Sequence, residues 1–188
     1  MRRDQRTQGH GADAEREAGG GAEQEHGGEC RRQAAYLTPA ERLLLWGMRT
    51  YVGGLRLGVP VMGCIRRTFA EGMAEAAAEP LEAVMIFLTE GACRPMEVKC
   101  PRCPAVSDDE RLLLRLAALG QAGDDASTMF LAREVLVPGA VQVAAPVFRM
   151  LGAALLEANL RLPPAGGTAA PRRAPRALLI LPQSDTVH

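Results

Sequence analysis

Two four-residue segments of this sequence carry the pattern of a helix N-terminus, and apolar residues with helical spacing follow each of them. Thr38-Pro39-Ala40-Glu41 and Ser107-Asp108-Asp109-Glu110 both place a glutamate three positions after a hydroxyl residue. In such a capping box, each side chain accepts a hydrogen bond from the backbone N–H of the other residue. The first box precedes an apolar stripe with spacings of three and four, at Leu44, Met48, Tyr51 and Leu55. The pattern predicts helices that pack through one apolar face.

Composition supports a helical fold without sheet. Leu, Met and Ala together number 62, whereas the β-branched Val and Ile number 15. We therefore predict an all-α protein, an irregular bundle of six or seven short helices with one extended and cysteine-containing interlude at about residues 94–106. Gly120 and Pro138-Gly139 are each expected to end a helix, and Pro146 to begin a new one. The expected helices cover residues 39–57, 60–71, 80–91, 108–119, 124–136, 139–145 and 146–159.

Both ends of the chain lack the pattern of a folded segment. Residues 1–33 contain no Val, Ile, Leu, Phe, Trp or Tyr, so they cannot bury enough apolar surface to offset an ordering cost of about 1–2 kcal/mol per residue. We predict a disordered N-terminal tail over residues 1–36, a helical domain over residues 37–162, and a Pro-, Arg- and Ala-rich tail over residues 163–188.

Charge and hydropathy bear on where the protein resides. Its 22 basic and 22 acidic residues balance, and no apolar segment of a secretory signal follows the first residues. The longest uncharged apolar stretch, between Glu134 and Arg149, contains Pro138 and Pro146 and is predicted not to span a membrane. We expect a cytoplasmic protein that has no membrane partner.

The amino-acid composition also bears on the source of the chain. All but one of the basic residues are arginine, and abundant Arg, Ala and Gly, which have GC-rich codons, indicate a bacterial source.

The predicted domain lacks histidine and a phosphate-binding loop, two features that many enzymes use. All three histidines, His10, His26 and His188, lie in the tails, so no Ser–His or Cys–His pair is available there. The only lysine, Lys99, follows no glycine-rich loop, which excludes a P-loop. No catalytic or cofactor-binding residue is assigned, and the sequence favours a protein that is not an enzyme.

The cysteines form the one group of residues whose spacing could support metal binding or thiol chemistry. Cys93, Cys100 and Cys103 follow the pattern C-x6-C-x2-C, and Cys64 lies in an earlier helix. A C-x-x-C turn brings two thiolates onto one metal ion, and structural zinc takes four such ligands. We consider three interpretations: ordinary packing, a zinc site with Cys100, Cys103, Cys93 and Cys64 as ligands, and thiol redox chemistry. Cys93 can join a zinc site only if residues 94–99 fold back.

Two further patterns have a structural explanation. The acidic residues at 108–110 and 124–125 lie in the first turns of predicted helices, where the helix dipole stabilises negative charge. We therefore interpret them as caps and not as catalytic pairs. Arg66 and Arg67 follow a helix–Gly-Val-Pro–helix arrangement that resembles a helix-turn-helix, but the balanced charge disfavours nucleic acid as a partner.

The function that these patterns favour is that of a non-enzymatic small helical interaction or structural module. Its C-P-R-C turn would be stabilised by a metal ion, with zinc as the candidate, and its partner would be a protein bound in an apolar groove between helices. A thiol redox protein that uses Cys100 and Cys103 is the first alternative. A small helix-turn-helix transcriptional regulator is the second.

Overall fold

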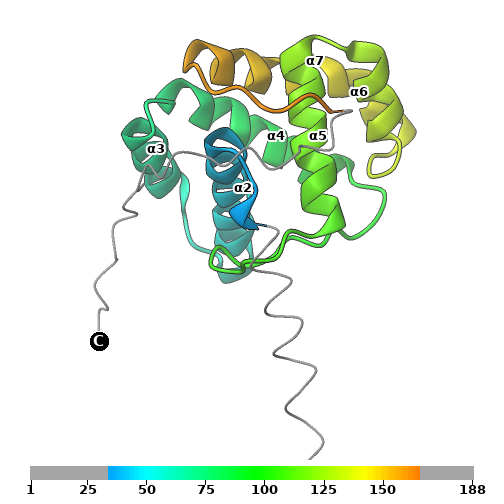
Figure 1. The fold of residues 1–188 in the computed structure, drawn as a ribbon. Coiled ribbons are helices and arrows are strands. Elements are labelled where there is room, and N and C mark those ends of the chain that lie inside the picture. The colour runs from blue at the N-terminus through cyan, green and yellow to red at the C-terminus, as the bar shows by residue number, and fades with distance from the viewer. Residues whose placement is uncertain (1–33, 166–188) are drawn as a thin grey trace, which may run out of the picture.

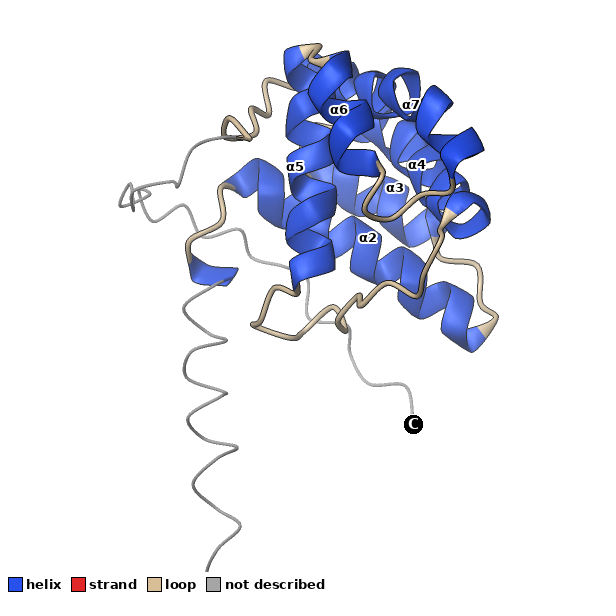
Figure 2. Ribbon diagram, turned by 90° about the vertical axis from the view of Figure 1, so that its right-hand side faces the viewer, coloured by secondary structure: helices blue, strands red, loops and turns tan. Residues whose placement is uncertain are grey.

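The computed structural model of the chain describes residues 34–165, and over this range the protein is helical with no β-strand (Figures 1 and 2). The predicted all-α bundle is therefore confirmed. The predictions made for residues 1–33 and 166–188 fall outside the described residues. The elements are α2 (Pro39–Leu57), α3 (Met62–Glu71), the 3-10 helix η1 (Glu75–Ala77), α4 (Ala78–Gly91), α5 (Asp108–Ala122), α6 (Asp125–Ala132) and α7 (Pro138–Glu157).

Both predicted capping boxes are present. Thr38 Oγ1 accepts a hydrogen bond from the backbone N–H of Glu41 at 3.2 Å, and the Glu41 carboxylate accepts one from the Thr38 N–H at 2.7 Å. Ser107 and Glu110 form the same pair of bonds at the start of α5. α2 ends where predicted, at Gly58, whose φ of 65° is in the left-handed region that favours glycine.

Two predicted helix ends were wrong. α5 does not end at Gly120 but continues to Ala122, and the left-handed residue that ends it is Gly123, with φ of 71°. α6 ends at Ala132 instead of near Leu136. Beyond this end, Leu136 pairs with Ala92 after α4 in an isolated antiparallel bridge. This bridge is the only β-pairing among residues 34–165, so the predicted extended interlude at about residues 94–106 contains no strand.

The last helices were also divided wrongly in the sequence prediction. Pro138 does not end a helix but occupies the first turn of α7, where its missing N–H costs nothing. Pro146 lies inside the same helix and does not break it. Pro146 removes the hydrogen bond that the carbonyl of Gln142 would accept, and both residues are exposed, so water can bind that carbonyl.

α7 is long and apolar enough to cross a membrane by length and composition alone. Its mean hydropathy is 1.5 over 18 residues, and 44% of that window is buried within the fold. The buried residues, among them Phe148, Leu151 and Leu155, lie on its inner face against the other helices. A core helix of a folded domain has this same character, so the cytoplasmic location remains a prediction.

The core forms around α7, which packs most extensively on α5 and also contacts α4 and α6. α4 in turn packs against α2 and α3, so it joins the two ends of the bundle (Figure 1). Glycines let α5 and α7 approach closely. A Cβ atom at Gly120 would lie 2.4 Å from the backbone oxygen of Phe148, and one at Gly152 would lie 2.4 Å from the backbone nitrogen of Gln121.

This close approach predicts opposite effects for two glycine-to-alanine substitutions. Gly120→Ala would push the backbones of α5 and α7 apart and should lower the free energy of unfolding by about 1–3 kcal/mol. Gly53→Ala, within α2, meets no atom within 4 Å and should raise it by about 0.5–1 kcal/mol because alanine favours helix. Urea unfolding measures both, and equal effects at the two positions would contradict the tight α5–α7 contact.

Candidate functional site

The segment between α4 and α5, residues 92–107, is the longest stretch without a helix among the described residues. We call it the Cys-turn loop. It runs along one end of the bundle beside α2 and α5 (Figures 1 and 2) and contains Cys93, Cys100 and Cys103. A connection of this length without secondary structure is uncommon in a compact domain, and ordered examples frequently carry function.

A buried arginine of α2 holds the far end of this loop. The side chain of Arg49 is only 3% exposed, and its Nε donates to Glu110 Oε1 at 2.7 Å while Nη2 donates to Oε2 at 2.8 Å. The same guanidinium donates to the backbone oxygens of Cys103, at 2.5 Å, and of Ala105. Arg49 therefore links α2 to the start of α5 and to the Cys-turn loop that precedes α5.

Glu110 completes the connection from the other side. Its carboxylate is fully buried and accepts hydrogen bonds from the backbone N–H groups of Lys99, at 2.9 Å, and of Ser107, also at 2.9 Å, besides those from Arg49. Burial alone would raise the pKa of Glu110, but these hydrogen bonds from Arg49 and the two amides outweigh it and hold the pKa below its ordinary value. Glu110 is thus an ionised carboxylate inside the fold.

A second ion pair, near the surface, holds the first half of the loop. Arg94 Nη2 lies 2.6 Å from Asp109 Oδ1, and Asp109 also accepts a hydrogen bond from the N–H of Glu97 at 2.6 Å. The hydrogen bond from Arg94 lowers the pKa of Asp109. Adjacent carboxylates at the start of α5, Asp109 and Glu110, therefore hold two successive parts of the Cys-turn loop.

Cys100 and Cys103 lie on one tight turn, as the C-P-R-C sequence predicts. The N–H of Cys103 donates to the oxygen of Cys100 at 3.0 Å, which closes the turn around Pro101 and Arg102. Cys100 is exposed and Cys103 is half-buried. Because the N–H of Lys99 is bound to Glu110 and the oxygen of Cys103 to Arg49, the buried ion pair holds both ends of this turn.

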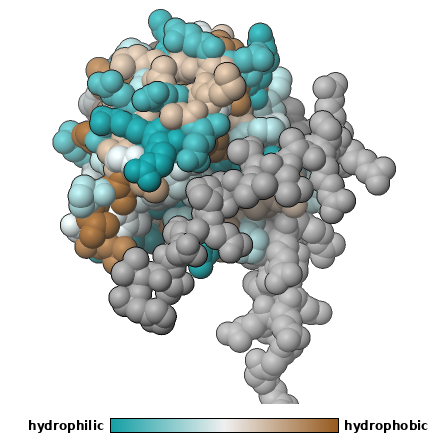
Figure 3. Space-filling view, turned by 90° about the vertical axis from the view of Figure 1, so that its left-hand side faces the viewer, coloured by the Kyte–Doolittle hydropathy of each residue, from teal (hydrophilic) through white to brown (hydrophobic). Residues whose placement is uncertain are grey.

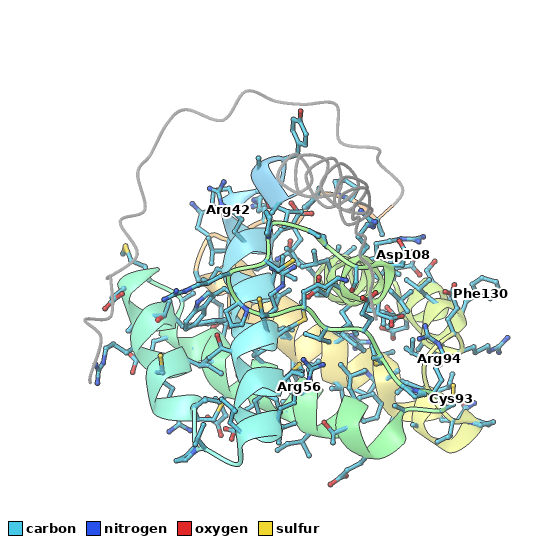
Figure 4. All side chains as sticks on the ribbon, turned by 90° about the horizontal axis from the view of Figure 1, so that it is seen from below. Arg42, Arg56, Cys93, Arg94, Asp108 and Phe130 are labelled. Carbon is cyan, nitrogen blue, oxygen red and sulfur yellow. The ribbon has the colours of Figure 1, made fainter. Side chains whose placement is uncertain are left out.

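The other two predicted metal ligands lie on other elements. Cys93 follows α4, where its N–H donates to the oxygen of Val135 at 2.9 Å, and it lies beside Arg94 at the edge of the molecule (Figure 4). Cys64 is an exposed residue of α3. Among residues 34–165, no group of three or more His, Cys, Asp or Glu side chains is placed to hold a metal ion. The structure thus brings Cys100 and Cys103 together, but it does not gather all four cysteines.

The acidic clusters, and one of the two arginines of α3, have structural partners. Asp124 caps α6 by accepting a hydrogen bond from the N–H of Ser127 at 3.0 Å. Hydrogen bonds from the side chain and then the backbone of Ser127 lower the pKa of Asp124. Arg66 on α3 lies 3.8 Å from Glu82, while Arg67 is exposed. This α3 surface, the reading helix of the helix-turn-helix alternative, therefore offers one of its two arginines to an intramolecular ion pair.

Sequence reasoning missed Arg49 and recognised only the capping role of Glu110. A signal for Arg49 was present in its position, because it lies four residues after Leu45 and three before Val52, at the edge of the apolar stripe of α2. A charged residue at such a position requires a buried partner or an exposed head group. No local pattern identifies that partner as a residue 61 positions away.

The buried pair predicts a large difference between two substitutions on the same helix. Arg49→Met leaves Glu110 buried without its cation and should lower the free energy of unfolding by about 3–5 kcal/mol. Arg56→Met is the matched control. Arg56 is exposed, with a 3.3 Å hydrogen bond to the oxygen of Val98, and its loss should change stability by about 0.5 kcal/mol or less. Similar values for the two variants in urea unfolding would contradict the account.

The lowered pKa of Glu110 also predicts how stability depends on pH. A carboxyl group whose pKa is lower in the folded state stabilises the fold above its ordinary value of 4.5, and this contribution is lost as the pH falls through the folded-state value. The difference in unfolding free energy between wild type and Glu110→Gln should therefore be constant near neutral pH and shrink only below pH 4.5. A difference that already shrinks well above pH 4.5 would show a raised pKa instead.

Comparison of the chain with models of protein families, with curated proteins and with solved structures found no match. Its function is therefore argued from the geometry of the Cys-turn loop.

Proposed function

We propose that the protein is a non-enzymatic helical interaction or structural module, and that its functional element is the C-P-R-C turn of the Cys-turn loop, with a metal ion held by the thiols. One observation carries this proposal: an accessible pair of cysteines lies on a turn whose two ends are bound to the buried pair Arg49–Glu110. Two thiolates at a fixed separation bind a metal ion at a lower entropic cost than two thiolates on a mobile chain.

Two basic residues flank or lie within the turn. Lys99 precedes Cys100, and Arg102 lies exposed within the turn. The ammonium of Lys99 is paired with Glu97, and that hydrogen bond chiefly raises the pKa of Lys99. The form of cysteine that binds metal ions is the thiolate.

The proposed protein partner is supported by apolar side chains that the domain leaves exposed. Met73, Leu57 and Phe130 are 85%, 76% and 70% exposed, and aromatic residues and methionine are enriched at protein interfaces. The face of the molecule in Figure 3 carries hydrophobic residues beside a hydrophilic band. These residues lie on different elements, so the Cys-turn loop remains the better-defined element.

Metal content and melting temperature test the proposal. Purified wild-type protein should carry a bound metal ion, and Cys100→Ser should lose it and melt at a lower temperature, because the metal stabilises the fold only when bound. A chelator should lower the melting temperature of the wild type to that of Cys100→Ser. Cys64→Ser is the matched control, an exposed cysteine on α3, and should behave as wild type. Metal-free wild type with unchanged melting in Cys100→Ser would contradict the proposal.

A second function, thiol redox chemistry, is favoured by the geometry of the turn. In a tight turn closed by a hydrogen bond between the first and fourth residues, as in Cys100–Cys103, the two end Cα atoms lie within about 7 Å. Disulfides span Cα separations of about 4.4–6.8 Å. Cys100 and Cys103 can therefore form a disulfide bond without large backbone movement. In this step they lose two electrons and two protons to a small-molecule disulfide, which is reduced to two thiols.

Thiol counting tests this second function. Treatment with glutathione disulfide should remove two free thiols per chain from the wild type, and a reductant should restore them. Cys103→Ser should lose this paired, reversible step, whereas Cys93→Ser should keep it. If Cys103→Ser still loses two thiols, or the wild type loses none, the turn is not the redox site.

A further inference from the structure

We infer that the Cys100–Cys103 turn is a two-thiolate site for a soft monovalent metal ion, copper(I). This inference rests on the proposed function and names the metal that the turn selects. It depends on the number of ligands, on their type, and on the charge beside them.

The number of ligands disfavours zinc. Structural zinc takes four ligands in a tetrahedron, and the four cysteines of the described residues do not form one group. Cys93 is bound through its backbone to Val135 beside α6, and Cys64 lies on α3. No third His, Cys, Asp or Glu side chain joins Cys100 and Cys103 within residues 34–165. A zinc ion at this turn would therefore receive only two of its four ligands from residues 34–165.

The type of ligand favours copper(I). Thiolates are soft donors that select soft ions such as copper(I), and this ion is satisfied by two thiolates on opposite sides of it. The turn brings two cysteines onto one short segment, because the N–H of Cys103 donates to the carbonyl oxygen of Cys100 at 3.0 Å. The exposed thiol of Cys100 and the half-buried thiol of Cys103 remain accessible to an ion from solvent.

The charge at the turn also fits this ion. Binding joins one copper(I) to two thiols and releases two protons, so the bound unit carries one net negative charge. Arg102, an exposed arginine between the two cysteines, supplies one positive charge close to this unit, whereas the ammonium of Lys99 is already paired with Glu97. Because two protons are released, binding should weaken as the pH falls.

The test is a titration of the reduced, full-length chain with copper(I), without oxygen and in competition with a chromophoric copper(I) chelator. The wild type should withdraw one copper(I) per chain from the chelator. Cys100→Ser and Cys103→Ser should each weaken this binding by roughly 100-fold or more, because loss of an outer-shell partner alone costs about 10–100-fold. Unchanged helical circular dichroism shows that each variant is folded.

A triple variant controls for the other cysteines. Cys30→Ser/Cys64→Ser/Cys93→Ser retains only the proposed pair and should bind one copper(I) as tightly as the wild type does. X-ray absorption at the copper edge should show two sulfur neighbours. Loss of binding in the triple variant, retention in Cys100→Ser, or three or more sulfur neighbours would overturn the two-thiolate site.

A parallel titration with zinc alone separates this inference from the proposed function. Tight binding of zinc without copper(I) binding, whether by one chain or shared between two, would overturn the inference and leave the proposed metal-binding module standing. If the turn binds neither ion, both fail. Copper(I) binding at one ion per chain together with weak zinc binding supports both.

Discussion

The conformation of the Cys-turn loop depends on the buried ion pair between Arg49 and Glu110. Removing two charges from water is costly, and the attraction between them offsets that cost only when their remaining hydrogen-bonding groups are satisfied. Here they are satisfied, because Arg49 donates four hydrogen bonds and the Glu110 carboxylate accepts four. Half of each set goes to the backbone of the loop or of the cap before α5.

Arginine suits this position for a geometric reason. Its planar guanidinium presents several N–H donors in a fixed fork, so one side chain can bind a carboxylate with two parallel bonds and still reach backbone oxygens. A lysine would offer a single nitrogen and could not hold Glu110, Cys103 and Ala105 together in this way. The consequence is that a segment without helix or strand is bound to the core at several points. The cysteine turn is then presented at the surface in a defined shape.

The sequence predicted the helices well where local chemistry decides them. The capping boxes at Thr38 and Ser107 and the left-handed Gly58 depend on residues a few positions apart, so their effect is local. Predictions were wrong where distant packing decides the outcome. Gly120 was interpreted as a helix end because glycine is common there, yet its lack of a side chain serves the contact with Phe148. Pro146 lies inside α7, where it and Gln142, whose carbonyl loses its helical hydrogen bond, are both exposed residues.

The candidate site shows the same division. The turn between Cys100 and Cys103 follows from four consecutive residues, and the structure confirms it. Whether Cys64 and Cys93 join that turn depends on how α3 and α4 pack, which no spacing in the sequence encodes. The ion pair of Arg49 with Glu110 also joins residues that are distant in sequence. The sequence therefore indicated the capping role of Glu110 but not its role as the buried partner of Arg49.

The amide hydrogen exchange of Lys99 tests the central claim most directly. This N–H lies outside any helix and donates to Glu110, so the account predicts slow exchange in the wild type. It predicts fast exchange in Arg49→Met, under conditions where amides of α5 and α7 remain protected. If the Lys99 amide stays as protected in Arg49→Met as in the wild type, the buried pair does not hold the Cys-turn loop.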